Sequence, residues 1–526
     1  MSSAKDEPGL CIFCRGLDPK SPWPFERASP KPPRGLFPFI YNNILLIEFS
    51  CGPESDQRIQ FMCKATLASW LEWLNCAHAR VGPFICVSKG LRMLNSLRMA
   101  LAAASMMASQ GVWAQTASMT DPIAKGEYIA RAANCVACHS LPDAPAFAGG
   151  LKMATPLGNI YATNITPDPD TGIGKYSLED FDNAVRKGVA RDGYRLYPAM
   201  PYPSYVKMSD EDVGALYEYF MKAVPAAKLA NKPSEIPFPL NMRWPLAAWN
   251  VLFIDMNEYT PKKDQSAEWN RGAYLVQGPG HCGACHTPRG LFWQEKALDE
   301  TGSGYLTGAE LDHWLAVNLT QDINSGLGRW SHDDIKSSLK TGVTPYGSAV
   351  GTMVEVINNS TQYLTDADLS AMSTYLKSLA PAKEKNAKPW AYANTTTEAL
   401  LKLDFTTAGA KVYVQQCRSC HADDGKGYGQ YMPPMAGNPG ALEPDPSTYI
   451  NLVLNGSMRL VVNGAPDGYR MPPFRAVLND QAVADVVSFT RNGWGNKAPA
   501  VTAAQVAKVR ADTDYATDKV IVLKMK

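Results

Sequence analysis

Three stretches of the 526-residue chain carry apolar residues at the spacing of an amphipathic helix. Their sequences are KGEYIARAAN, RGAYLVQGPGH and AGAKVYVQQ, and they align at Gly126, Gly272 and Gly409. Apolar side chains that recur at i, i+3 and i+4 lie on one face of a helix. The pattern therefore predicts one helical unit that is repeated along the chain.

Each copy is followed by a second apolar run that a capping residue introduces. Ser209 precedes DEDVGALYEYF, Thr365 precedes DADLSAMSTYL, and Asn479 precedes DQAVADVVSF. Ser, Thr and Asn side chains accept hydrogen bonds from the free N–H groups of a first helical turn. These residues therefore predict the start of a closing helix in each copy.

The segment between the two helices is also repeated. TNITPDPDTGIGKYSLEDFDNAVRKG (163–188) matches VNLTQDINSGLGRWSHDDIKSSLKTG (317–342) nearly position by position, whereas the third copy keeps only TYINLVLNGS. The predicted fold class is mainly α.

The first helix of each copy ends in the motif C-x-x-C-H. The three motifs consist of Cys135, Cys138 and His139, of Cys282, Cys285 and His286, and of Cys417, Cys420 and His421. Two thiols three residues apart on a helical turn face the same side, so both can add to the vinyl groups of one porphyrin. The histidine then supplies the proximal iron ligand. The sequence predicts three covalent haem c groups in three tandem class I cytochrome c-like domains.

Two other interpretations of these motifs are weaker. Gly278, Gly280 and Gly283 match the G-x-G-x-x-G of a dinucleotide-binding turn, and Asp299 and Glu300 follow at about the distance of a ribose-binding carboxylate. The other two copies lack these glycines but keep their cysteines. A disulfide or a zinc site would not require a histidine after the second cysteine in all three copies.

Methionine is the predicted second iron ligand. Met200 (YPAMPY), Met353 (VGTMVEV) and Met471 (YRMPPF) each lie between the motif and the closing helix. A thioether ligand favours ferrous iron and suits electron transfer. The remaining histidines downstream of residue 115, which are His281, His313 and His332, do not recur in register. With all iron positions filled, we expect no catalytic site.

The predicted boundaries follow from these repeats. Residues 115–235, 263–385 and 386–500 form the three domains, 236–262 is an apolar linker, and 501–526 is a C-terminal tail. The linker contains IPFPLNMRWPLAAWNVLFIDMN, which could enter a membrane interface or line a quinone site. Packing between two haem domains explains the same composition and is the preferred interpretation.

The first part of the chain differs from the rest. A basic start at Met93, an apolar Ala-rich stretch and a small residue at Ala114 predict a secretory signal peptide over 93–114. Residues 1–92 hold six of the 12 cysteines without a periodic apolar pattern, and Cys11-x-x-Cys14 is followed by Arg15 instead of histidine. We interpret 1–92 as an over-long translation start or a disordered extension, with an extra domain or zinc module as the alternative.

Charge excludes one class of partner. The 51 Lys and Arg residues balance 50 Asp and Glu residues, so no basic field for nucleic acid is expected. No apolar run is long enough to predict a transmembrane helix.

The chain resembles the triple-haem cytochrome c subunits of membrane-bound sugar, polyol and alcohol dehydrogenases. The resemblance covers about residues 121–500 and rests on the three C-x-x-C-H motifs, LYPAMPYPS, GHCGACHTPRG and WGNKAP. It implies a relay that takes electrons from a larger dehydrogenase subunit and passes them to ubiquinone. The implied location is the periplasmic face of the bacterial inner membrane, with peripheral membrane association.

The resemblance favours a flavoprotein partner with a small third subunit, of the gluconate, sorbitol or fructose type. A quinoprotein alcohol dehydrogenase is the alternative partner. Two other functions stay open at this point, which are a self-contained haem peroxidase or reductase with one five-coordinate iron, and a shuttle cytochrome that joins no complex.

Overall fold

The computed structural model describes residues 40–41, 44–45, 120–517 and 519–525. The chain divides into two compact units, Met1–Ala108 and Ser109–Lys526. In the first unit, β1 (Ile40–Tyr41) pairs antiparallel with β2 (Ile44–Leu45). The predicted signal peptide and the rest of the predicted extension lie outside the described residues.

Most of the second unit is helical, and each sheet in its described residues is a hairpin of two short strands. Its helices enclose three large apolar cores, around Ile129 and Tyr219, around Leu275 and Tyr375, and around Tyr413 and Phe489, besides two smaller buried clusters. We call residues 122–222, 267–378 and 395–512, which supply most of these cores, the first, second and third segments. The predicted mainly α fold class is confirmed.

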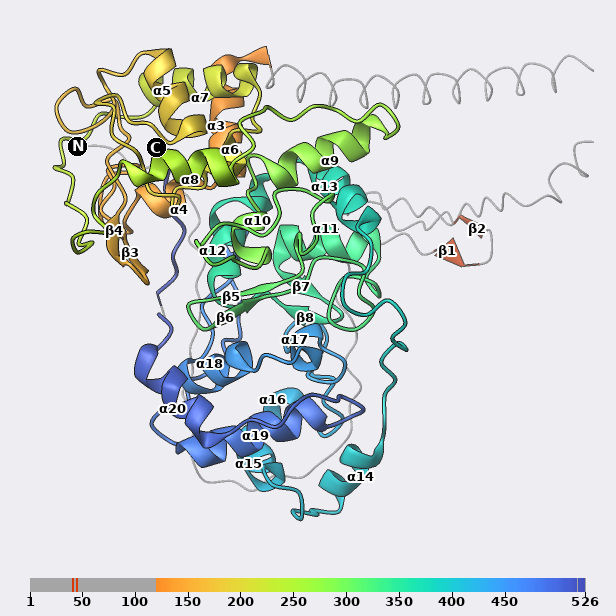
Figure 1. Ribbon diagram of the computed structural model, residues 1–526. Helices are drawn as coiled ribbons and strands as arrows, with labels where there is room; N and C mark the ends of the chain where they lie inside the picture. Colours follow the sequence, from red (N-terminus) through yellow and green to blue (C-terminus); the bar gives the residue numbers. More distant parts are fainter. Residues whose placement is uncertain (1–39, 42–43, 46–119, 518, 526) are drawn as a thin grey trace, which may run out of the picture. The chain divides into compact units, whose positions relative to one another are not determined.

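The first segment begins with the predicted repeat helix and ends with the predicted closing helix (Figure 1). Ser209 caps the closing helix, because its side chain accepts from the N–H of Asp212 at 3.2 Å. In chain order the elements are α3 (Pro122–Ala132), α4 (Cys135–His139), β3 (Lys152–Thr155), β4 (Gly158–Tyr161), α5 (Leu178–Lys187), α6 (Tyr202–Tyr205) and α7 (Asp210–Lys222).

The second segment repeats this order and adds a hairpin and a helix. Thr365 caps its closing helix through the N–H of Asp368 at 3.1 Å. The elements are α9 (Ala267–Gln277), α10 (Gly283–His286), β5 (Ala309–Leu311), β6 (Trp314–Ala316), α11 (His332–Thr341), β7 (Val343–Thr344), β8 (Gly347–Ser348), α12 (Thr352–Asn359), the 3₁₀ helix η2 (Thr361–Tyr363) and α13 (Asp366–Ser378).

The third segment keeps the first and closing helices but differs between them. Asn479 caps its closing helix through the N–H of Ala482 at 2.9 Å. The elements are α14 (Thr395–Leu401), α15 (Ala410–Gln416), α16 (Arg418–His421), α17 (Pro439–Leu442), α18 (Ser447–Asn455), β9 (Val461–Val462), β10 (Ala465–Pro466), α19 (Asp480–Asn492) and α20 (Ala503–Asp512).

The three aligned glycines allow the first and closing helices to cross closely. A Cβ atom on Gly126 would lie 2.0 Å from the carbonyl oxygen of Ala215 in α7, and one on Gly272 would lie 1.9 Å from that of Ala371 in α13. A Cβ atom on Gly409 would lie 2.3 Å from the carbonyl oxygen of Asp485 in α19. Since real side chains never approach backbone this closely, each crossing requires glycine.

A reciprocal polar contact joins the first and second segments. The Tyr128 hydroxyl of α3 donates to the Asp368 carboxylate of α13 at 2.6 Å, and the Tyr274 hydroxyl of α9 donates to the Asp212 carboxylate of α7. Tyr128 and Tyr274 each follow an aligned glycine by two positions. The two segments therefore contact each other through equivalent residues, as subunits of a two-fold dimer do.

A cation within each segment completes this contact. Lys125 of α3 binds Asp212 at 2.7 Å, and Arg271 of α9 binds Asp368 through two hydrogen bonds of 2.8 Å. Burial works to raise the pKa of Asp368, but the hydrogen bonds and charge of Arg271 prevail and hold it below its usual value. Asp368 is therefore a carboxylate at neutral pH.

One face of the linker helix α8 (Pro245–Phe253) packs against both of the first two segments. Asn250 is buried and accepts from the Tyr202 hydroxyl at 2.9 Å, while Trp249 donates to the backbone oxygen of Phe292 at 2.9 Å. Packing therefore accounts for this face, as expected. Val251 and Leu252 on the helix remain 82% and 72% exposed, which packing does not explain.

The C-terminal tail returns from the third segment to the first. Leu523 and Met525 are buried in the first core, and the Tyr219 hydroxyl donates to the backbone oxygen of Met525 at 3.1 Å. Among the described residues of both units, no helix has the length and apolar character needed to cross a membrane.

We predict that Gly272→Ala lowers the free energy of unfolding by about 3 kcal/mol, because the new methyl group overlaps the Ala371 carbonyl. The matched control is Gly214→Ala in α7, where a new Cβ meets nothing within 4 Å. This substitution should raise the free energy of unfolding by about 0.5–1 kcal/mol, because alanine favours the helix more than glycine does. Denaturant unfolding of the purified protein measures both changes, and equal effects would contradict the close crossing.

We predict that Asp368→Asn lowers the free energy of unfolding by about 2 kcal/mol at pH 7, because Arg271 loses its ionic partner and the Tyr128 hydroxyl loses a charged acceptor. Asp366→Asn is the control, since the Asp366 side chain is 84% exposed. The Asp368 pKa is lowered by folding, so its contribution is present above the unfolded pKa and is lost as the pH falls through the folded pKa. Thermal unfolding should show the two proteins converging in acid, and a constant difference would argue against this ion pair.

Candidate haem sites

The three C-x-x-C-H motifs lie on short helical turns that follow α3, α9 and α15. In the second motif the N–H of His286 donates to the carbonyl of Cys282 at 2.9 Å, and in the third the N–H of His421 donates to the carbonyl of Cys417 at 3.0 Å. These bonds fold each cysteine and its histidine into one turn. None of the six motif cysteines forms a disulfide.

A backbone carbonyl orients each motif histidine. The Nδ1 atoms of His139 and His286 lie 2.7 Å from the oxygens of Thr163 and Val317, which are equivalent positions of the repeat. The Nδ1 atom of His421 lies 3.1 Å from the oxygen of Pro433. Because a carbonyl only accepts, Nδ1 must carry the proton, which leaves the Nε2 lone pair for a metal.

Burial keeps these rings neutral. It lowers the pKa of His139, His286 and His421, and the hydrogen bond to the carbonyl only partly opposes this effect. A histidine must be neutral to bind a metal. The rings are therefore in the form that an iron ligand requires.

Burial also keeps the first cysteine of each motif protonated. It raises the pKa of Cys135, Cys282 and Cys417 to about 12, with a smaller contribution from the second cysteine of each motif. Zinc sites bind thiolates, which electropositive surroundings favour. In the described part of the chain, no group of three or more His, Cys, Asp or Glu side chains is placed to hold a bare metal ion. The donor set therefore fits a porphyrin better than zinc.

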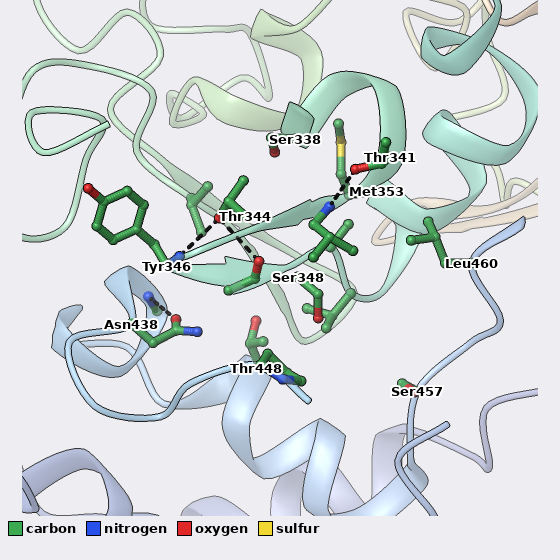
Figure 2. A pocket seen from close by; sticks show the side chains of 18 of the residues that line it. Ser338, Thr341, Thr344, Tyr346, Ser348, Met353, Asn438, Thr448, Ser457 and Leu460 are labelled. Carbon is green, nitrogen blue, oxygen red and sulfur yellow. Dashed lines mark hydrogen bonds between the residues drawn. The ribbon is translucent and has the colours of Figure 1, made fainter. Parts of the chain in front are cut away.

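A cavity of about 1290 Å³ connects the second and third motifs. Cys282, Cys285 and His286 line it from one segment, and Cys417, Cys420 and His421 line it from the other. Figure 2 shows Met353, Thr344 and Ser348 on the second segment and Asn438 and Thr448 on the third. Pockets for one ligand usually measure about 300–1,000 Å³, so this volume suits two neighbouring groups.

The first motif lies next to the second. Helix α4, which carries Cys135 and His139, contacts α12, which carries Met353. The ring of Tyr205 packs edge-on against the ring of His281 with centroids 5.5 Å apart. The second motif therefore has the first as a neighbour on one side and the third on the other.

The predicted methionine ligands lie near their motifs. Met353 and Met471 line the shared cavity, and Met200 packs against the same apolar core as Cys135. Met432, Met435 and Met458 also line the cavity, although the sequence did not indicate them. Only the recurrence of methionine before the closing helix distinguishes Met471 from these neighbours.

The other histidines of the described segments have protein partners. The Nδ1 atom of His281 lies 2.9 Å from the oxygen of Pro279, and that of His332 lies 3.0 Å from the hydroxyl of Ser373. His313 lies 3.2 Å from the Asp512 carboxylate of the third segment. These contacts suit packing roles.

The dinucleotide interpretation fails on backbone grounds. Gly278 ends helix α9, and the segment from Gly278 to Gly283 joins this helix to α10. A dinucleotide-binding turn instead connects a β-strand to the helix whose first N–H groups bind the pyrophosphate. The glycines therefore serve the loop of the second motif.

Small helical segments with paired cysteines beside a neutral, carbonyl-oriented histidine define a c-type cytochrome. Comparison with known proteins supports this class. The family described as "Cytochrome c" matches residues 123–223, and the family described as "Cytochrome C oxidase, cbb3-type, subunit III" matches residues 404–489. These matches imply covalently attached haem c.

Full-length relatives identify the family more closely. The chain is 50% identical to a gluconate 2-dehydrogenase cytochrome c subunit of Pantoea cypripedii, over 74% of this chain and 90% of the relative. It is 45% identical to the cytochrome c subunit of a quinone alcohol dehydrogenase of Gluconacetobacter polyoxogenes, over 80% and 91%. It is 39% identical to a fructose dehydrogenase cytochrome subunit of Gluconobacter japonicus, over 74% and 82%. The chain belongs to this family of dehydrogenase cytochrome c subunits.

Proposed function

We propose that this chain is the electron-transfer subunit of a dehydrogenase complex and that it carries three haem c groups in three tandem cytochrome c domains. The observation that carries the proposal is the threefold occurrence of one arrangement, in which a carbonyl holds Nδ1 of the motif histidine beside two cysteines that form no disulfide. The domains correspond to residues 115–235, 263–385 and 386–500.

The nine motif residues hold the three groups. The cysteines would form the thioether bonds, each histidine would offer Nε2 to iron, and Met200, Met353 and Met471 would supply the second iron ligands. When bound, haem c supplies iron that changes between the ferric and ferrous states and so accommodates one electron. The apolar walls exclude water, and a neutral sulfur ligand stabilises the ferrous state.

The arrangement of the sites supports a relay. The second motif shares its cavity with the third and lies against the first through α12 and Tyr205. A row of neighbouring sites can pass an electron from one site to the next, which a relay needs and a single reactive centre does not. The second site is the middle of this row.

The partner is a larger dehydrogenase subunit. The higher identity to the gluconate dehydrogenase relative favours the flavoprotein type with a small third subunit, and the alcohol dehydrogenase relative makes a quinoprotein the second candidate. The electron acceptor is ubiquinone, at the periplasmic face of the inner membrane. Copurification of a flavin-bearing subunit from the native membrane tests the partner, and isolation of the cytochrome alone would support a shuttle instead.

We predict that the exported protein contains three haems by pyridine haemochrome assay and that Cys417→Ala with Cys420→Ala contains two. Loss of both thioether bonds removes the attachment of one group only, because the other motifs lie on separate turns. The control is Ser419→Ala within the same motif, which should retain three. Fewer than three haems in the unmodified protein would contradict the proposal.

We predict that Met471→Ala lowers the potential of one haem and gives it a high-spin component, because a thioether ligand both fills the iron position and favours the ferrous state. Met458→Ala is the matched control, since Met458 lines the same cavity but does not recur in the repeat. Absorption spectra of the two variants report the spin state, and redox titration reports the haem potentials. If Met458→Ala shows these changes and Met471→Ala does not, Met458 is the ligand.

A further inference from the structure

A solvent-exposed apolar surface lies across the linker helix and the loop that follows the second motif. Its residues are Trp244, Val251 and Leu252 of the linker and Leu291, Phe292 and Trp293 of the loop, and they are between 51% and 87% exposed. The rings of Phe253 and Phe292 stack with centroids 5.8 Å apart, and Trp249 donates to the Phe292 oxygen. These contacts join helix and loop into one surface, which we call the apolar patch.

The exposure does not result from poor packing of the helix. The opposite face of α8 is fixed, because Asn250 is bonded to Tyr202 and Ile254 packs with Tyr202 and Val206 in a buried cluster. The apolar patch is thus held on an ordered support. Contiguous exposed apolar surfaces of this kind mark contacts with a protein or a membrane.

Side-chain chemistry favours a lipid surface. Helix α8 carries no charged residue, and the two tryptophans are the side chains that prefer the interface between lipid and water. Protein docking sites also combine an apolar centre with a polar rim, so the sign of the surrounding charge decides between the two partners.

Charge around the apolar patch is complementary to anionic headgroups. The segments 191–195, 238–256 and 289–296 contain the cations Arg191, Arg195, Arg243, Arg289 and Lys296. They contain the acids Asp192, Asp255 and Glu295, and the Glu295 side chain is only 6% exposed and faces Arg289. The surroundings are therefore net positive, which anionic lipids attract.

We propose that the apolar patch enters the headgroup region of an anionic bilayer and so holds the second haem segment against the lipid surface. This inference rests on the proposed function only for its consequence, which is that a lipid-soluble electron acceptor would reach the protein beside the second motif. Membrane contact itself depends on the apolar patch and the charges around it, and not on the haem groups.

Flotation of the haem-loaded protein with vesicles tests the inference. We expect binding to vesicles of phosphatidylcholine and phosphatidylglycerol, weaker binding to phosphatidylcholine alone, and release by high salt. Leu252→Glu with Leu291→Glu should lower the partition constant at least about tenfold, because two exposed apolar side chains are replaced by charges. Leu401→Glu, at a 66% exposed position of α14 outside the apolar patch, should bind as the unmodified protein does.

A folding control and a milder variant distinguish loss of membrane binding from loss of the fold. Haem content and the absorption spectrum show that the double variant is folded, and Trp244→Ser provides a milder change at a 73% exposed position that should also weaken binding. Unchanged flotation of these variants would overturn the inference. Loss of dehydrogenase copurification with normal vesicle binding would also overturn it and identify a protein contact. Failure of the haem assay would instead concern the proposed function.

Discussion

The structure depends on the hydrogen bond between each motif histidine and a backbone carbonyl. This bond fixes the ring and its tautomer, so Nε2 keeps its lone pair for a metal while the ring stays neutral. The carbonyls of Thr163 and Val317 come from the repeated segment after the hairpins, which explains why this segment is duplicated with the motifs. The third segment reaches the same geometry with Pro433 from a different loop.

The duplicated residues also have a second role. In the first two segments, a cation, a tyrosine and an aspartate near the helix crossing form the contact between the segments. The third segment has Lys411 at the position of the tyrosine and Ala482 at that of the aspartate, so it cannot form this contact. It instead faces the second segment through the shared cavity and polar contacts such as Thr448 with the N–H of Leu315 at 2.7 Å.

Much of this could be predicted from the sequence because it is local or repeated. The aligned glycines, the capping residues and the three motifs predict the helices and the sites, and the glycines proved to be the points where helices cross. The reciprocal tyrosine–aspartate contact was not predicted, since Tyr128 and Asp368 are distant in sequence and ordinary in composition. The tail was also missed, because VIVLKMK carries no periodic signal and the burial of Leu523 and Met525 depends on a core formed near the other end of the described segments. The methionine ligands stay a prediction, because Met458 and Met471 share one cavity.

The central claim is that each of the three irons has a nitrogen and a sulfur ligand, so that the chain transfers electrons and does not react with small molecules. Electron paramagnetic resonance of the oxidised, unmodified protein tests this claim most directly. The account predicts only low-spin ferric signals that integrate to three per polypeptide. A high-spin signal from one haem in the intact protein would contradict it and indicate an open iron position.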